Sequence, residues 1–550
     1  MPTLNWMGKD KVVNHHNDVP YKVLEQKYSF DNKGKHEDSN GSENMIIHGD
    51  NLEALKSLLP KYEGRIKCIY IDPPYNTGNE KWVYNDNVND LRIKKWLGEV
   101  VGKEGEDFSR HDKWLCMMYP RLKLLQKLLS DDGAIFISIS DIECSFLKLI
   151  CDEIFGYNHF IADVTVVNNF KGRSDDKYIA TASEHLLIYH NGNFITNGVP
   201  LPEEYENDYK EVDKDGNRYR LQGLRKRGSN SKRSDRPNMY YPFYYDINNN
   251  VVTLEKENDD MIEIYPYLSD GSEGRWRWGK NTAIEKIEQI MVRKVHGKDR
   301  YDVFQIDYLN NGQSKRVKPK SIWIGSEFAK ETGTLEIKNI FGNSTFDTPK
   351  SVAHIQYCLE QALGETDIVL DSFAGSGTTA HAVLNMNKAD GGNRKFILIE
   401  MEDYADTITA ERVKRVIKGY GEDKKKVEGV GGDFSYYELG EPIFKDNLLN
   451  PAVSADKIRE YVYYMETKKP LENPIDMDEP YFMAIHDNTA YYFFYEKDEE
   501  TVLDLESLNM NVKQKAESYV IYADSLLLDE AFLAKHNITF KKIPRDIARL

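Results

Sequence analysis

Cysteine is scarce in this 550-residue chain, and long apolar runs are missing. The five cysteines, Cys68, Cys116, Cys144, Cys151 and Cys358, include no CxxC pair, which argues against a zinc site or a disulfide framework and fits a reducing cytoplasm. No uninterrupted apolar stretch is long enough to cross a bilayer, and the N-terminus has no apolar core like that of a signal peptide. We therefore expect a cytoplasmic protein with no resident metal and no membrane partner.

Positive charge is also in deficit, because the formal net charge is −17. Local charge matters more than net charge for binding a polyanion, and residues 218–237 carry a single acid, Asp235. The basic residues of this stretch are Arg218, Arg220, Arg225, Lys226, Arg227, Lys232, Arg233 and Arg236. A solvated charged face is one interpretation. The Gly, Ser, Asn and aromatic residues beside the run favour a phosphate-binding surface equally.

The pattern along the chain predicts five regions. Residues 1–44 are polar and predict a loose N-terminal arm. Helical and strand-like periods alternate over 45–190 and again over 339–437, which predicts a parallel α/β sheet made of two separated halves. Residues 191–338 are irregular and predict an inserted domain. Residues 438–550 predict a small separate α/β domain.

Two prolines interrupt the helical patterns. We expect a helix over Asn51–Leu59 to end at Pro60, and a helix over Trp114–Leu129 to be interrupted near Pro120. A proline inside a helix removes one backbone hydrogen bond and clashes with the preceding turn.

The decapeptide IYIDPPYNTG, Ile69–Gly78, is the most informative segment. Its apolar, β-branched beginning predicts a buried strand. The strand ends at Asp72-Pro73-Pro74-Tyr75, since prolines lack the N–H donor that a sheet ladder needs. The resulting corner presents a carboxylate, a backbone carbonyl and an aromatic face. These groups suit a planar amine, with two acceptors for its amino hydrogens and a ring to stack on it.

A second segment, DSFAGSGTT at residues 371–379, follows a strand-like run and precedes a helix. It matches neither GxGxxG nor a P-loop, which bind phosphates at a helix N-terminus. S-adenosylmethionine has no phosphate and needs a tight turn with an acid for its α-amino group, which Asp371 supplies. Glu400 ends the next strand and suits ribose hydroxyls, and Asp50 suits the adenine amino group. The loop residues expected to bind this cofactor are Phe373, Ala374, Gly375, Ser376, Gly377 and Thr378.

Simpler roles remain open for these residues. The two glycines fit an ordinary strand–helix turn, and Asp50 fits a helix N-cap, a role that does not exclude cofactor binding.

With DPPYNTG preceding DSFAGSGTT, the chain resembles the β-class amino-methyltransferases of DNA, in particular the modification subunit of a type III restriction–modification system. The likeness runs from about Met45 to Tyr437. Further matching segments are GDNLEAL (49–55), SEHLLIY (183–189), FDTPKSV (346–352) and ERVKRVIKGY (411–420).

The resemblance implies a Rossmann-like, circularly permuted methyltransferase fold with an inserted target-recognition domain. It implies methylation of N6 of a flipped-out adenine in double-stranded DNA, because cytosine N4 enzymes more often have Ser where this chain has Asp72. It also implies that Thr348 and Lys350 line the methionine end of the cofactor site. A homodimer, a separate helicase–nuclease subunit and a docking or dimerisation role for the C-terminal domain are further implications.

Other functions compete with this interpretation. One is an adenine methylase that acts alone, and another is a non-catalytic DNA-binding subunit. An RNA or protein-amide acceptor and a single-chain restriction enzyme are further alternatives. The intact DPPY corner, both glycines and Glu400 argue against a relic pocket, and Asp72 with the large insertion favours DNA. We find no nuclease constellation and no room for a helicase.

Overall fold

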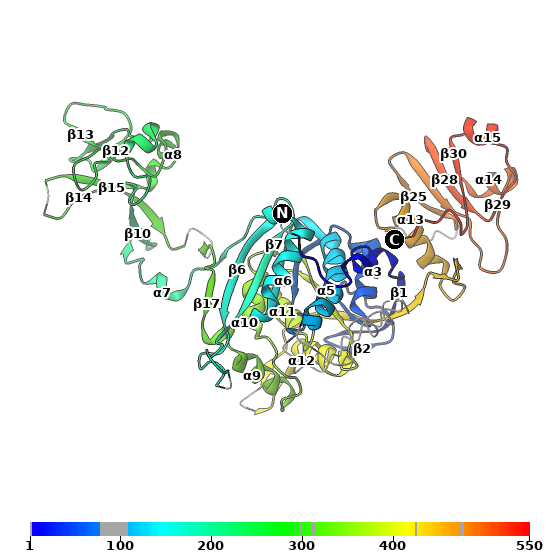
Figure 1. The fold of residues 1–550 in the computed structure, drawn as a ribbon. Helices are drawn as coiled ribbons and strands as arrows, with labels where there is room; N and C mark the ends of the chain where they lie inside the picture. The colour runs from blue at the N-terminus through cyan, green and yellow to red at the C-terminus, as the bar shows by residue number, and fades with distance from the viewer. Residues whose placement is uncertain are drawn as a thin grey trace. The chain divides into compact units, whose positions relative to one another are not determined.

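The computed structural model describes residues 3–76, 108–174, 176–297, 299–310, 315–423, 426–472 and 478–549. The chain forms two compact units, one of residues 1–197 with 320–550 and the other of Gly198–Pro319 (Figure 1). No helix within these described ranges is long and apolar enough to cross a membrane.

One eleven-stranded sheet organises the larger unit. Its strands, from edge to edge, are β17 (Ile322–Ile324), β6 (Phe160–Val167), β7 (Ser183–His190), β5 (Leu129–Ile139), β4 (Ile66–Ile71), β18 (Ile368–Asp371), β19 (Lys395–Glu400), β3 (Met45–His48), β22 (Asp433–Pro442), β1 (Lys22–Asp31) and β2 (Gly34–His36). The six strands from β5 to β22 are mutually parallel. In sheet order β18 and β19 lie between β4 and β3, although they follow both in the chain. The fold is therefore a Rossmann-like α/β fold whose halves are permuted.

The sheet is mixed, which corrects the expectation of a parallel one. Strand β7 runs antiparallel to both β5 and β6, and β1 runs antiparallel to β22. A parallel neighbour requires a crossover connection, usually a helix. The connection between β6 and β7 contains no helix among its described residues, so the chain turns back beside itself.

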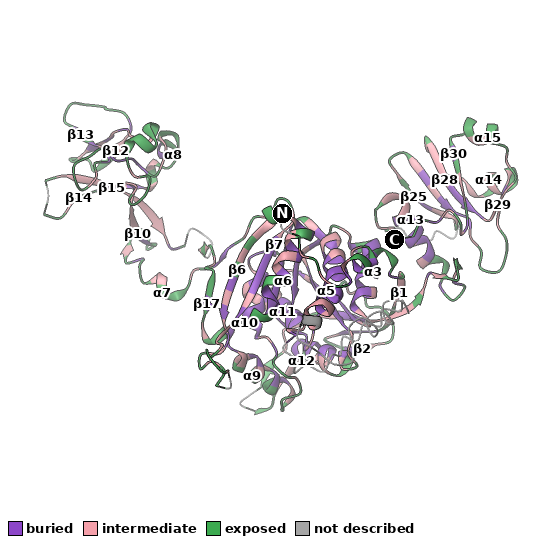
Figure 2. Cartoon of the chain, in the orientation of Figure 1, coloured by how far each residue is buried: buried purple, intermediate pink, exposed green. Residues whose placement is uncertain are grey.

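Helices cover both faces of the sheet. Helices α3 (Asn51–Tyr62), α5 (Phe108–Leu128) and α6 (Asp141–Cys151) pack on one face, and α10 (Val352–Leu359), α11 (Thr378–Asp390) and α12 (Glu411–Lys418) on the other. Successive residues of a strand point to opposite faces. Accordingly, Ile69 and Ile71 join the first core, and Cys68 and Tyr70 join the second. Buried residues therefore follow the central strands (Figure 2).

Neither proline ends a helix, so both predicted breaks are wrong. Pro60 lies within the last turn of α3, and Pro120 lies within α5. An interior proline costs about 3 kcal/mol or more. Leu58 and Leu59 beside Pro60 are completely buried, and burial of such side chains stabilises by roughly 1.5–3 kcal/mol each, which offsets that cost.

The loose arm predicted for residues 1–44 is wrong for much of that segment. It contains α1 (Lys9–Val12), α2 (His15–Asp18) and β1, which pairs with β22 from Lys22–Pro442 to Asp31–Asp433. Val23, Tyr28 and Phe30 are buried, so apolar side chains among the polar ones anchor this strand.

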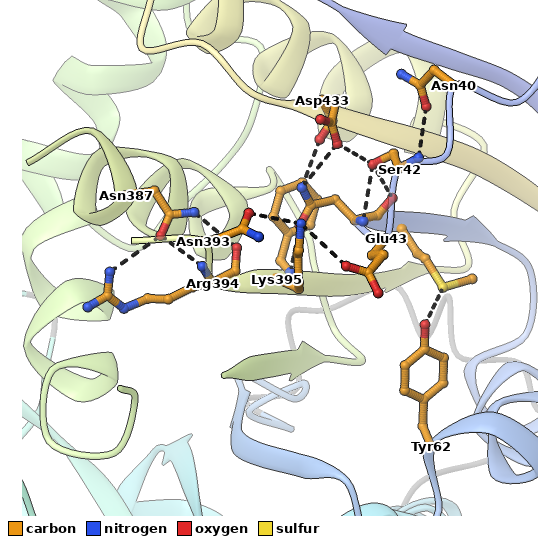
Figure 3. A network of polar contacts seen from close by, with 12 residues as sticks. Asn40, Ser42, Glu43, Tyr62, Asn387, Asn393, Arg394, Lys395 and Asp433 are labelled. Carbon is orange, nitrogen blue, oxygen red and sulfur yellow. Dashed lines mark hydrogen bonds and ion pairs between the residues drawn. The ribbon is translucent and has the colours of Figure 1, made fainter. Parts of the chain in front are cut away.

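A polar network joins both halves at the amino ends of the parallel strands (Figure 3). Lys395, which begins β19, lies 3.6 Å from Glu43, and Ser42 hydrogen-bonds Asp433 at the start of β22. The side-chain oxygen of Asn387 accepts a hydrogen bond from the backbone N–H of Arg394 at 3.0 Å. Ligands of open α/β sheets bind at the opposite, carboxyl ends of the strands. This network therefore stabilises the amino-end side of the sheet, and the carboxyl ends of the strands are the place to look for a ligand site.

The smaller unit has its own core around Phe243 and Trp276. Its elements are β8 (Val199–Pro200), α7 (Glu203–Glu206), β9 (Glu211–Val212), β10 (Arg218–Gly223), β11 (Phe243–Asp246), β12 (Val251–Thr253), β13 (Ile262–Ile264), α8 (Lys280–Glu285), β14 (Ile290–Lys294), β15 (Tyr301–Tyr308) and β16 (Arg316–Val317). This unit is narrower than the inserted domain predicted over 191–338. Strand β17 and α9 (Lys330–Phe341) belong to the larger unit.

Residues beyond β22 add a four-stranded sheet of β25, β26, β28 and β30. The elements of this region are β23 (Phe444–Lys445), β24 (Leu448–Leu449), α13 (Ala455–Thr467), β25 (Phe482–His486), β26 (Thr489–Phe493), β27 (Val502–Leu503), α14 (Leu505–Asn511), β28 (Ser518–Ala523), β29 (Ser525–Leu526), α15 (Glu530–Lys535) and β30 (Ile538–Lys542). Tyr492 and Ile521 are fully buried in its core.

Candidate functional site

A cavity of about 390 Å³ lies where β4, β18 and β19 end. Most of the predicted site residues line it: Asp72, Pro73, Pro74, Tyr75, Thr348, Lys350, Asp371, Phe373, Ala374, Gly375, Ser376, Thr378 and Glu400. Two segments far apart in the sequence meet here because Ile69 of β4 is in register with Leu370 of β18.

The corner after β4 is held by hydrogen bonds to its backbone. Trp114 Nε1 donates to the Pro74 carbonyl at 2.7 Å, and Ser140 Oγ donates to the Tyr75 carbonyl at 3.1 Å. Asn76 follows with a φ of +55°, which turns the chain away from the strand direction. Thr77 and Gly78 of the predicted segment lie outside the described residues.

Lys350 connects the corner to the rest of the cavity. Its Nζ lies 3.0 Å from each carboxylate oxygen of Asp72 and 2.8 Å from the hydroxyl of Tyr75. Burial alone would lower the pKa of Lys350, but the carboxylates of Asp72 and Glu184 outweigh it and raise that pKa. The lysine therefore stays positively charged beside the corner.

Glu184 of β7 is a cavity residue that the sequence reasoning did not select. It is buried, and its Oε2 accepts hydrogen bonds from the Tyr75 hydroxyl at 3.0 Å and from Asn168 Nδ2 at 2.7 Å. Acids are almost never fully buried without partners. A lone glutamate preceding the apolar run of β7 was the available signal.

The loop after β18 needs its glycines for backbone reasons. Gly375 and Gly377 adopt φ values of +51° and +79°, a region that other residues rarely enter. A Cβ on Gly377 would lie 2.9 Å from the Thr409 carbonyl oxygen. The Gly375 N–H donates to Glu400 Oε2 at 2.7 Å, so the loop contacts the end of β19 directly.

Asp371 and Glu400 are two buried acids facing the same cavity. Asp371 accepts from the Thr379 hydroxyl at 2.5 Å and the Phe373 N–H at 3.1 Å, and Glu400 accepts from Gly375 and Glu402 N–H groups. Burial raises the pKa of each carboxyl to about 7. Neither forms an ion pair with any described residue. Such acids suit a cationic ligand that also offers hydroxyl donors.

Arg412 of α12 hydrogen-bonds the loop after β18, and the sequence reasoning did not select it either. Its Nη1 donates to Ser376 Oγ at 2.9 Å and to Thr378 Oγ1 at 2.6 Å, and its Nη2 lies 3.6 Å from Glu336. The guanidinium is fully buried, and burial lowers its pKa to about 10. Arg412 lies on the buried face of α12 with Val413 and Val416. Sequence reasoning missed it because a charged residue is normally expected on the exposed face of a helix.

Asp50 has the simpler of its two predicted roles. It caps α3 by accepting the Leu52 and Glu53 N–H groups at 2.9 and 3.2 Å. It is absent from the residues that line the cavity, as is Gly377. A contact with the adenine of a cofactor stays a prediction.

The basic run of the smaller unit is only partly free. Four of its members are engaged with acids of the same unit: Arg218 with Glu206, Arg220 with Asp307, Arg225 with Asp302 and Arg233 with Glu273. Lys226 is half-buried. Arg227, Lys232 and Arg236 are exposed and form no ion pair with the described residues. These three are the strongest candidates for phosphate contacts.

The profile of one protein family, described as DNA methylase, matches residues 66–411. The chain is 33% identical to the type III restriction–modification enzyme EcoPI Mod subunit of Escherichia phage P1, a match over 73% of this chain and 64% of that protein. It is 38% identical to the type II methyltransferase M.KpnI of Klebsiella pneumoniae, over 64% of this chain and 80% of that protein. The solved structure of the M1.HpyAVI–SAM complex aligns with a TM-score of 0.30 and 14% identity, over 67% of this chain and 98% of that one.

Proposed function

Because this chain belongs to the DNA methylase family, we propose that it transfers a methyl group from S-adenosylmethionine to N6 of an adenine flipped out of double-stranded DNA. One observation carries the proposal. The register of β4 with β18 brings Asp72, with its two prolines and Tyr75, to the same cavity as the loop that begins at Asp371.

The residues of the cavity suit S-adenosylmethionine. Asp371 would pair with its α-amino group, Glu400 would accept ribose hydroxyls, and Gly375 would let the ligand approach the backbone. Thr348 and Lys350 would lie at the methionine end, as the family resemblance implies. When bound, the cofactor supplies an electrophilic methyl group on a sulfonium.

The chain's own residues would activate the acceptor. The lone pair of an adenine amino group is conjugated into the ring and is a poor nucleophile. Asp72 and the Pro73 carbonyl would accept the two amino hydrogens, turning the nitrogen towards tetrahedral geometry and freeing its lone pair. Tyr75 would stack on the base, a contact worth roughly 1–3 kcal/mol. Catalysis would then rest on positioning and electrostatics, with proton loss following transfer.

The cellular role follows from the relatives. The EcoPI relative is a type III Mod subunit, so we propose a cytoplasmic modification subunit that works as a homodimer and binds a separate helicase–nuclease. Region 438–550 is the candidate for docking or dimerisation. M.KpnI is a type II methyltransferase, which supports a methylase acting without such a subunit as the second candidate. Purification of the tagged chain from its own cells, followed by mass spectrometry, separates the two.

Methylation-sensitive sequencing of DNA from cells expressing this chain tests the proposal. We expect N6-methyladenine at one short recurring sequence, absent from cells that carry the empty vector. Modification of cytosine N4 would overturn the adenine assignment, and unmodified DNA together with no binding of S-adenosylmethionine by the purified protein would overturn the activity.

Cofactor affinity should increase with pH. Burial raises the pKa of Asp371 and of Glu400 to about 7, so below that pH the ligand's amino group must displace a proton from Asp371 and its ribose hydroxyls a proton from Glu400. For one such carboxyl, affinity should fall roughly tenfold from pH 8 to pH 6. Isothermal titration calorimetry at several pH values measures this. Equal affinity across the range would contradict it, and Glu400→Gln should remove one of the two protonation steps.

The exposed basic residues should set the salt dependence of DNA binding. Each phosphate contact contributes about 0.9 to the slope of log affinity against log salt. The triple variant Arg227→Gln, Lys232→Gln, Arg236→Gln should therefore reduce that slope by up to roughly 3. Fluorescence anisotropy at several salt concentrations measures it. Arg293→Gln is the control, since Arg293 is paired with Glu211. An unchanged slope in the triple variant would exclude these residues as phosphate contacts.

A further inference from the structure

The ammonium of Lys350 is bound to the carboxylate proposed to accept the target amine. It lies 3.0 Å from both carboxylate oxygens of Asp72 and so straddles them. An ammonium and an adenine amino group both offer N–H donors to the same acceptors. In this state of the protein, Asp72 therefore already binds an amine, and the target base must compete with it.

A second carboxylate stands ready on the other side of the lysine. Glu184 Oε1 and Oε2 lie 3.3 and 3.4 Å from Lys350 Nζ, so Glu184 already pairs with the lysine, but at longer distances than the 3.0 Å contacts with Asp72. Charge-assisted N–H···O bonds are usually about 2.7–2.9 Å long. A shift of roughly half an ångström would complete the contact with Glu184 while lengthening the one with Asp72.

The hydrogen bonds of Glu184 leave one of its oxygens available. Oε2 accepts from Tyr75, from Asn168 and, at 3.4 Å, from Lys350, whereas Oε1 is buried and accepts no hydrogen bond from the described residues. Buried polar atoms without a partner are rare in folded proteins. Within the described part of the chain, Oε1 has only the 3.3 Å ion pair with Lys350, so it can accept that ammonium more closely if the lysine moves.

Charge balance favours the same movement. Lys350 is half-buried, Glu184 is buried, and Lys350 is the cation of the described residues that forms an ion pair with both carboxylates, while Lys330 acts on Glu184 from farther away. An isolated carboxylate inside a protein is costly, so one of the two acids keeps the lysine. If the neutral target amine satisfies Asp72 by hydrogen bonds, the lysine is free to neutralise Glu184.

We propose that Glu184 is a positioning residue: it receives the Lys350 ammonium when the amino group of the target adenine takes that ammonium's place on Asp72. This inference rests on the proposed methyl transfer. Glu184 does not touch the reacting atoms. It acts through Lys350, and it sets how readily Asp72 becomes available to the base.

A different role for Glu184 is to orient Tyr75 through the tyrosine hydroxyl. The two roles predict different partners in double-mutant cycles. If Glu184 acts through Lys350, the effects of Glu184→Gln and Lys350→Met depend on each other. If it acts through the hydroxyl, the effect of Glu184→Gln disappears in a Tyr75→Phe background.

The test uses the full chain and DNA that carries the sequence found by methylation-sensitive sequencing. Glu184→Gln keeps the shape but removes the charge, so Lys350 stays on Asp72. We expect the single-turnover methylation rate to fall at least about tenfold, with unchanged Kd for DNA and for S-adenosylmethionine. The double variant Glu184→Gln, Lys350→Met should be faster than Lys350→Met alone, because it removes both charges of the pair.

Controls separate this inference from folding and from the proposed function. Asp163→Asn, an exposed acid of β6 paired with His185, should keep the wild-type rate. Thermal unfolding shows whether each variant is folded. A wild-type rate for Glu184→Gln, or losses that simply multiply in the double variant, would overturn the role of Glu184 alone. Absence of methylation by the wild-type chain would instead overturn the proposed function.

Discussion

Replacement of Asp72 by asparagine is expected to abolish methyl transfer while the protein still binds S-adenosylmethionine. Asparagine offers one acceptor oxygen and turns an NH₂ group towards the amino hydrogens of the base. It also lacks the charge that pairs with Lys350 at 3.0 Å. Loss of a single well-placed hydrogen-bonding group in an active site costs about 10²–10³ in rate. We expect a larger loss here, because the NH₂ group of asparagine also repels the amino hydrogens of the base.

Single-turnover methylation with saturating cofactor measures the effect, and calorimetry reports cofactor binding separately. Asp132→Asn is the matched control, because Asp132 is an exposed acid of β5 that pairs with Lys67. Asp72→Ala should be equally inactive, since it lacks both carboxylate oxygens. Substantial methylation by either purified Asp72 variant would show that Asp72 does not hold the target amine.

The two motifs were predictable because each is encoded within a few consecutive residues. Proline chemistry ends β4 just before Asp72, and positive φ values require glycine at positions 375 and 377. The family predicted from these motifs is confirmed by the matching family profile and relatives. The predicted α/β fold is confirmed as well. It was predictable because strands and helices have different local periods, about 2.0 and 3.6 residues.

Contacts between distant parts of the chain were not predictable in the same way. Glu184 and Arg412 look like ordinary charged residues until the fold buries them against Tyr75 and Ser376. The basic run shows the converse. Its sequence suggests eight free charges, but Asp302 and Asp307, far along the chain, neutralise two of them. Pairing at long range decides which charges remain available, and no local pattern records it.

The N-terminal segment was misjudged for a related reason. Lys22–Asp31 is mainly polar, and its alternation is too weak to indicate a strand by itself. Its partner is β22, which follows it by about 400 residues in the sequence, so no local pattern could indicate the pairing. Pairing with an existing sheet edge supplies the backbone hydrogen bonds that make such a segment a strand.

Replacement of Arg412 by methionine should weaken both cofactor binding and the fold. The guanidinium is fully buried and donates to Ser376 and Thr378, the two hydroxyls that follow the turn at Gly375. Its removal leaves these hydroxyls and Glu336 without their cationic partner. Breaking a fully buried ion pair on one side typically costs about 3–5 kcal/mol, and the cost here should be smaller because Glu336 is half-buried and 3.6 Å away. Part of that cost falls on the loop, so we expect affinity for S-adenosylmethionine to fall at least roughly tenfold.

Arg415→Met is the matched control, because Arg415 lies on the same helix and pairs with Glu411 at its more exposed surface. Exposed ion pairs contribute about 0–1 kcal/mol, and Arg415 also donates to the Ile340 carbonyl at 2.9 Å, so this variant should keep cofactor affinity while its unfolding temperature falls slightly. If Arg412→Met does not fold, Ser376→Ala and Thr378→Val remove the acceptors one at a time and test the same contacts. Wild-type affinity in Arg412→Met and in both acceptor variants would mean that the loop holds its conformation without the arginine. If only Arg412→Met and the acceptor variants lose affinity, then Arg412, which lies outside the segment 371–379, determines the conformation of the cofactor loop.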